Sequence, residues 1–243
     1  MKYSDIYRLY STSQPKDAIH QALREVSVDD SDEQYEDRSP LHLACQYGDA
    51  EGVKILLERD AEPNTKDANG STPIHILGRT SAGRADEDKL KEIAVMLMEH
   101  GANIPRSAKN KTALIEGVRN RHFKMAEAII NSGARVNSTD LNGENVLFGF
   151  CAASGDIRRD IRFAKKELDE SVQYSYPENK IEEIRSRIAR LEDDGEVAYR
   201  LARRLVEEDK ADPEDKSNSG KTAWDAAIEN LSLIHISEPT RLR

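Results

Sequence analysis

The feature that most constrains this chain is a short block that returns at a nearly fixed spacing. The block begins as Ser39-Pro40-Leu41-His42 and runs to Gly48. Related blocks begin 33 residues later, then after a further 40, 33 and 77 residues, at Thr72, Thr112, Asn145 and Thr222. A period of this size indicates an array of small structural units, each of which packs mainly against its neighbours.

The block resembles the ankyrin repeat, whose signature is Thr-Pro-Leu-His-x-Ala at a period of about 33 residues. Thr72-Pro73-Ile74-His75 repeats the signature, and His100-Gly101-Ala102-Asn103 resembles the way the family's repeats close. The resemblance implies an all-α solenoid of about five helix–turn–helix repeats with outward β-turn fingers. It is clearest in the first two repeats and weakens toward the C-terminus.

The repeat spacing divides the chain into segments. Residues 1–33 are predicted to form an N-terminal helical cap with two short helices over 2–26, followed by an acidic linker. That acidic run is interpreted as solvated, with docking of a basic partner as the alternative. Repeats are expected at 34–66, 67–106, 107–139, 140–216 and 217–230, the second with an insertion of about seven residues after Gly78.

The fourth repeat carries a longer insertion. Its first helix is expected over 145–153, followed by an inserted antiparallel helical hairpin over 157–194. Ile157, Ile161, Ala164 and Leu168 form one apolar stripe, Ser175-Tyr176-Pro177 interrupts it, and a second stripe follows from Ile181. The delayed second helix is expected over 196–208. Because both insertions fall between the two helices of a repeat, we expect them to project from the same end of the stack.

The last residues, 231–243, have a different origin in this interpretation. Every codon from Leu231 to Arg241 can be read as the end sequence that a transposase attaches to DNA fragments during library preparation. We therefore interpret 231–243 as an artefactual tail, with a natural frame that continues past Asn230 and a metagenomic, bacterial source. The missing second helix of the fifth repeat would leave Trp224 and Ile228 uncovered and make the chain prone to association.

Composition narrows the class of partner. The net charge of −9 argues against nucleic acid, because binding to phosphates requires an excess of Lys and Arg. The chain has no run of 18 apolar residues and no apolar N-terminal signal, so we expect neither a membrane span nor a membrane partner. Cys45 and Cys151 are predicted to be small buried thiols. A cytoplasmic location follows, with a secreted effector as the alternative.

The sequence contains no catalytic or cofactor motif. A phosphate-binding glycine loop, a nucleophile elbow and a His-Glu-x-x-His helix are all missing from it. His42 and His75 could suggest a metal, but the resemblance gives this histidine a structural role, bridging helix and turn by hydrogen bonds. His100 and His122 are expected to be isolated surface residues. We therefore predict no enzyme activity, cofactor, metal or small-molecule substrate.

The function implied by the resemblance is binding of an unknown protein partner through the fingers and the concave face. Residues at the family's variable positions are the candidate contacts: Tyr35, Glu36, Gln46, Tyr47, Ala68, Asn69, Ser71, Ala108, Lys109, Lys111, Leu141, Asn142, Glu144, Asn218 and Ser219. They lie in turns and loops, which are usually exposed. Three alternatives are a targeting module of a larger enzyme or membrane protein, a scaffold that oligomerises through the hairpin, and a purely structural spacer. The hairpin itself is interpreted as a solvated, salt-bridged element, with a recognition arm or a nucleic-acid face as rivals.

Overall fold

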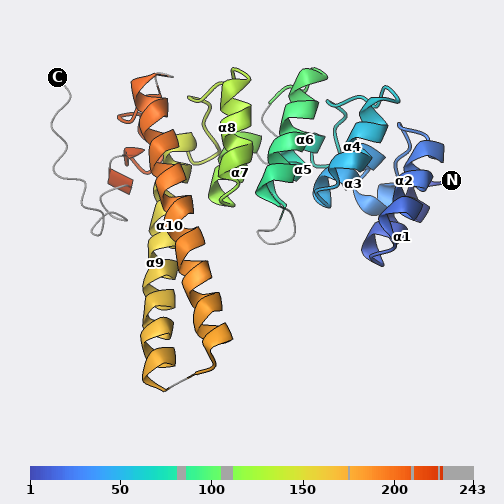
Figure 1. The fold of residues 1–243 in the computed structure, drawn as a ribbon. Coiled ribbons are helices and arrows are strands. Elements are labelled where there is room, and N and C mark those ends of the chain that lie inside the picture. Colours follow the sequence, from blue (N-terminus) through green and yellow to red (C-terminus); the bar gives the residue numbers. More distant parts are fainter. Residues whose placement is uncertain (81–85, 105–111, 175, 209–210, 224, 227–243) are drawn as a thin grey trace. The chain divides into compact units, whose positions relative to one another are not determined.

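The computed structural model describes residues 1–243 except 81–85, 105–111, 175, 209–210, 224 and 227–243 (Figure 1). The regular elements of the described residues are helices, apart from one isolated bridge between Lys216 and Thr222. Backbone contacts divide the chain into two units, residues 1–146 and 147–243. The all-α fold expected from the sequence is confirmed.

The first unit opens with the two short helices expected there, α1 (Tyr3–Ser11) and α2 (Lys16–Glu25). Their apolar faces bury Ile6 and Leu23 completely. The acidic segment that follows is structured. Asp30 accepts a hydrogen bond from the Tyr3 amide at 2.7 Å, and Asp32 caps the 3₁₀ helix η1 (Glu33–Tyr35). These two carboxylates therefore stabilise the cap in addition to facing solvent.

Three helix pairs follow, α3 (Pro40–Gln46) with α4 (Ala50–Leu57), α5 (Pro73–Gly78) with α6 (Glu87–Glu99), and α7 (Ala113–Arg119) with α8 (Phe123–Asn131). First helices pack on first helices, α3 on α5 and α5 on α7, and second helices pack on second helices. Pro40 and Pro73 occupy the first helical turn, where a missing N–H is tolerated.

The signature histidine bridges a helix and a turn, as the resemblance implies. His42 Nδ1 accepts from the Ser39 amide at 3.1 Å, and Nε2 donates to the Ser71 carbonyl of the next repeat at 3.0 Å. His75 Nδ1 accepts from the Thr72 amide in the same way at 3.3 Å. The predicted bridge is confirmed for His42, whereas the contact described for His75 is the one to Thr72 at the start of its own helix. The prediction for His122 is wrong, because its side chain is buried and bonded to the preceding repeat.

The second unit contains two long helices, α9 (Val146–Gln173, 28 residues) and α10 (Glu178–Glu207, 30 residues), which run antiparallel (Figure 1). The separate helices expected over 145–153 and 196–208 do not exist. Each is continuous with one arm of the hairpin, so the insertion lengthens both helices of the fourth repeat. The predicted interruption is confirmed, because α9 ends at Gln173 and α10 begins at Glu178.

The two long helices continue through three glycines, Gly149, Gly155 and Gly195, because buried side chains on both sides of these positions favour the helix. A glycine inside a helix costs about 1 kcal/mol relative to alanine. Burial of Ala164, Ile184 and Ile188 toward the tip, and of Leu201 and Leu205 toward the base, outweighs that penalty. The predicted exposure of Trp224 and Ile228 and the proposed artefactual tail concern residues outside those that the structure describes.

Candidate functional site

The finger turn before α5 is held by one aspartate. The Asp67 carboxylate accepts from the amides of Asn69 at 2.9 Å and Ser71 at 2.8 Å, and the Asp67 amide donates to the Ser71 carbonyl at 2.9 Å. Gly70 has a φ of 66°, a left-handed conformation that glycine adopts without strain. The turn is therefore fixed from inside by a buried side chain, and its other side chains are left for outside contacts.

The same construction recurs before α9. Asp140 accepts from the amides of Asn142 at 2.8 Å and Glu144 at 3.1 Å, and Gly143 has a φ of 73°. In the second unit Ser217 takes the place of the aspartate. Its amide donates to the Lys221 carbonyl at 2.8 Å, and Gly220 has a φ of 78°. Three described fingers thus share one backbone hydrogen bond, and the two that begin with aspartate also share the bonds from the carboxylate to the turn amides.

Three arginines, which we call the arginine ladder, connect successive repeats of the first unit. Arg38 Nε lies 3.6 Å from Asp67, Arg79 Nε lies 2.7 Å from Glu116, and Arg119 Nη2 lies 3.3 Å from Asp140. Their side chains are 22%, 25% and 30% exposed, so each guanidinium also reaches the surface. Partly exposed arginines beside a groove or finger are frequent anchors for protein partners.

Sequence reasoning missed this ladder, although the sequence contains a signal for part of it. Arg79 stands seven residues after Thr72, and Arg119 stands seven residues after Thr112. The two arginines therefore occupy the same position of consecutive repeats. Glu116 has no such periodic counterpart, since Ile76 holds the matching place.

All but one of the predicted contact residues fall into three groups. Exposed are Glu36, Ala68, Leu141, Asn142, Asn218 and Ser219. Half-buried are Tyr35, Gln46, Tyr47, Asn69 and Glu144. Ala108, Lys109 and Lys111 lie outside the described residues. Within the first unit, the exposed group sits on the finger turns held by Asp67 and Asp140, together with the turn at Glu36.

Ser71 is a correction to the predicted set. It is fully buried, because its amide bonds to Asp67, its carbonyl accepts from His42 and its hydroxyl accepts from Arg79 at 3.1 Å. All of its polar groups are used inside the protein. Ser71 therefore builds the finger and is not available to a partner.

Tyr35 and Tyr47 are largely engaged with the N-terminal cap. The Tyr35 ring lies 4.2 Å from that of Tyr7 and 5.7 Å from that of Tyr3, measured between ring centres. Tyr47 stacks on Tyr10 at 4.8 Å. Only the outer faces of these rings are open to a partner, so their first role is to fix α1 against the repeats.

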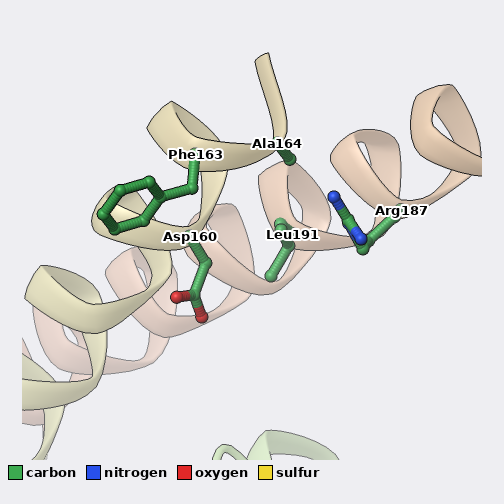
Figure 2. A pocket seen from close by; sticks show the side chains of 5 residues that line it. All are labelled: Asp160, Phe163, Ala164, Arg187 and Leu191. Atoms are coloured by element: carbon green, nitrogen blue, oxygen red, sulfur yellow. The ribbon is translucent and has the colours of Figure 1, made fainter. Parts of the chain in front are cut away.

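The α9–α10 hairpin presents a shallow open groove of about 260 Å³ (Figure 2). Asp160, Phe163 and Ala164 line it from α9, and Arg187 and Leu191 line it from α10. Phe163 is 64% exposed, and the hairpin also exposes Val172, Tyr174, Tyr176 and Tyr199. Of these exposed side chains, Phe163 is the one that lines the groove, so it is the candidate apolar contact of the hairpin.

The two cysteines are chemically quiet. Both are free, Cys45 buried and Cys151 half-buried. Burial raises the pKa of the Cys151 thiol to about 11, and that of the Cys45 thiol further. Neither is a reactive thiolate at neutral pH, because the thiolate is the nucleophilic form.

Within the described part of the chain, no three His, Cys, Asp or Glu side chains are grouped so as to hold a metal ion. Among the same residues, no helix combines the length and apolar character needed to cross a bilayer.

Comparison with known proteins gives a consistent family. The model of the family described as ankyrin repeats (many copies) matches residues 23–77. A transient receptor potential cation channel subfamily A member 1 homolog from Caenorhabditis elegans is 46% identical over 48 residues, which cover 20% of this chain and 4% of that protein.

Two further relatives match longer stretches. Rabankyrin-5 from Mus musculus is 34% identical over 115 residues, 45% of this chain and 9% of that protein. Neurogenic locus notch homolog protein 1 from Xenopus laevis is 29% identical over 141 residues, 58% of this chain and 5% of that protein. The chain thus spans less than a tenth of the length of each of these relatives.

Proposed function

This chain is an ankyrin-repeat protein, and we propose that it is a non-catalytic module that binds a partner protein through its fingers and concave face. Ankyrin repeats in general serve protein–protein interaction. For this chain we propose more specifically an adaptor that binds its partner through the exposed finger residues and the arginine ladder.

One observation carries this proposal, namely the division of labour within each finger. Asp67, Gly70 and Ser71 make the turn together with the Asn69 amide, while the Ala68 side chain is exposed and that of Asn69 is half-buried. In the fourth repeat Asp140 makes the turn, and Leu141, at its tip, is 62% exposed. A turn that is rigid before binding loses little conformational entropy on association.

The test compares two variants of the full chain with the parent in affinity capture from a cell lysate, with quantitation of every captured protein. The finger variant combines Ala68→Arg with Leu141→Arg, which places bulky charge on two exposed tips. The control variant is Glu99→Arg, an exposed substitution at the end of α6. Circular dichroism confirms that both variants keep the parent's helix content.

The expected result is a set of proteins that parent and control capture and that the finger variant loses by about tenfold or more, the loss typical of one disrupted anchor. Capture of the same proteins in the same amounts by all three chains contradicts the proposal, because the fingers would then contribute nothing to binding.

Because the relatives are much longer than this chain, the module could serve a larger enzyme or membrane protein as its targeting part. A cytoplasmic location remains part of the proposal and is supported by the two free cysteines, which a reducing compartment preserves.

A second candidate function, self-association through the hairpin, is favoured by a charge pattern on α9. Helix α9 carries the exposed Arg159 and Arg162 near its middle and the exposed Asp169 and Glu170 near its C-terminal end. Two copies placed antiparallel would set Arg159 opposite Glu170 and Arg162 opposite Asp169, twice over by symmetry. Exposed ion pairs contribute little alone, so exposed Phe163 would supply the apolar contact.

A further inference from the structure

The imidazole of His122 joins the third repeat to the second at two points. The side chain is 3% exposed and stands directly before α8. Nε2 lies 2.6 Å from the carbonyl oxygen of Thr80, which follows α5, and Nδ1 lies 2.8 Å from Oε1 of Glu87, the first residue of α6. One ring therefore contacts both helical elements of the preceding repeat.

Both partners of His122 accept hydrogen bonds and cannot donate them. A carbonyl oxygen has only lone pairs, and so does an ionised carboxylate. A neutral imidazole carries one N–H, and only the imidazolium carries two. The observed pair of contacts is therefore satisfied when His122 is doubly protonated. A neutral ring would direct a lone pair at either Thr80 or Glu87.

His42 shows the opposite arrangement in the same protein. Its Nδ1 accepts from a backbone amide and its Nε2 donates to a carbonyl, so a single proton satisfies both contacts. Burial lowers the pKa of His42 to about 4, in keeping with a neutral ring. Two buried histidines of one repeat array thus face partners that call for different protonation states.

Glu87 links His122 to the start of α8, because its carboxylate contacts both the His122 ring and a backbone amide of α8. Glu87 uses its second oxygen to accept from the Lys124 amide at 3.1 Å, in the first turn of α8. Helix α8 has no capping bond from its own preceding residue, so Glu87 of the neighbouring repeat caps it. The Lys124 ammonium is bonded to Asp88 at 2.8 Å. The acids of α6 thus face both His122 and Lys124.

We propose that His122 is a proton-dependent clamp between the second and third repeats. In the imidazolium form it donates to Thr80 and Glu87 and holds the start of α6 against the start of α8. Loss of the proton removes one of the two bonds and turns a lone pair toward an acceptor. The Glu87 cap on α8 then loosens, and with it the contact between α6 and α8.

The first test is NMR of the full chain with isotopically labelled histidine, followed over a pH series. The ring-nitrogen shifts separate doubly protonated from singly protonated rings, and spectra of His122→Gln assign the His122 signals. The expected result is a doubly protonated His122 ring in the acidic part of the series, at pH values where His42 is still singly protonated. A His122 ring that is singly protonated wherever His42 is singly protonated overturns the proposal.

The second test measures whether the protonation of His122 changes the stability of the first turn of α8. Hydrogen exchange of the Lys124 amide, corrected for the pH dependence of intrinsic exchange, should accelerate by about tenfold as His122 loses its proton, the effect of one charge-assisted hydrogen bond. His122→Gln should show no such step, because glutamine does not titrate. An identical step in parent and variant would show that the clamp is not the cause.

Two matched carboxylate variants separate the roles of neighbouring charges. Glu87→Gln keeps the shape and one acceptor but removes the charge that faces Nδ1, so the imidazolium should be lost at a lower pH than in the parent. Asp88→Asn touches Lys124 and not His122, so it should leave the His122 titration unchanged. Equal effects of the two substitutions contradict the assignment of Glu87 as the partner.

Discussion

At the scale of one residue, the His42 imidazole makes the first helix pair sensitive to acid. The ring is fully buried, and burial lowers its pKa to about 4. In the unfolded chain a histidine titrates near 6.5. Between these two values the unfolded chain binds a proton that the folded ring refuses, so the stabilisation is complete above about pH 6.5 and is lost as the pH falls toward about 4.

This shift predicts a loss of about 3 kcal/mol in the free energy of unfolding over that interval, at about 1.4 kcal/mol per unit of pKa. Urea unfolding at a series of pH values measures it. His42→Gln should be less stable at neutral pH and should lose less stability on acidification. His100→Gln, at an exposed site, should keep the parent's slope. Parallel profiles for the parent and His42→Gln would refute the assignment.

The two histidines also show why some side chains are predictable from sequence and others are not. His42 is bonded to Ser39, three residues before it, and to Ser71 in the next finger. Both partners stand at fixed positions of the repeat, so the repeat period predicts them. His122 bonds to Thr80 and Glu87, which flank the insertion of the second repeat. No periodic signal marks those two residues, and only the folded chain shows that they meet one ring.

At the scale of one element, α10 contains a glycine that its packing does not require. A Cβ placed on Gly195 would meet the Ile157 methyl at 3.6 Å, an ordinary van der Waals distance. Gly195→Ala should therefore stabilise the hairpin by about 1 kcal/mol through helix propensity. The shift of the thermal midpoint of helix loss, followed by circular dichroism, measures this gain.

A matched substitution gives the opposite sign. A Cβ on Gly78, at the end of α5, would lie 2.9 Å from the Ala113 carbonyl oxygen, a backbone atom that cannot move aside cheaply. Gly78→Ala should destabilise the chain. A Gly195→Ala variant no more stable than the parent would show that the bend or spacing of α10 at this point does need glycine.

Two glycines of the long helices, Gly155 and Gly195, explain where the prediction of helix ends failed. Helix type and the turn near Pro177 followed from apolar spacing and from proline geometry. The separate helices predicted over 145–153 and 196–208 imply helix ends near Gly155 and Gly195. In the structure, buried apolar residues lie on both sides of each position. They run from Val146 past Gly155 in α9, and past Gly195 to Leu205 in α10. Continuous burial overrides the weak preference of one glycine.

At the scale of the whole molecule, the exposed apolar side chains of the hairpin predict an association that depends on concentration. Sedimentation of the full chain should show a dimer, and Phe163→Lys should raise its dissociation constant by about tenfold or more, as expected for removal of a central aromatic anchor. Val172→Lys is the matched control, because Val172 is also exposed on α9 but nine residues away, about 180° around the helix. An equal effect of both substitutions, or a parent that stays monomeric throughout, would refute a specific interface.

The finger turns have a consequence for how such a chain can change over generations. Residues that hold the turn and residues that face outward are different residues, since Asp67 and Gly70 do the first and Ala68 does the second. Mutation at a tip can thus alter what is bound without loosening the turn. Binding specificity and folding therefore depend on different residues. A few substitutions at the finger tips can give a descendant of this chain a new target while the scaffold stays unchanged.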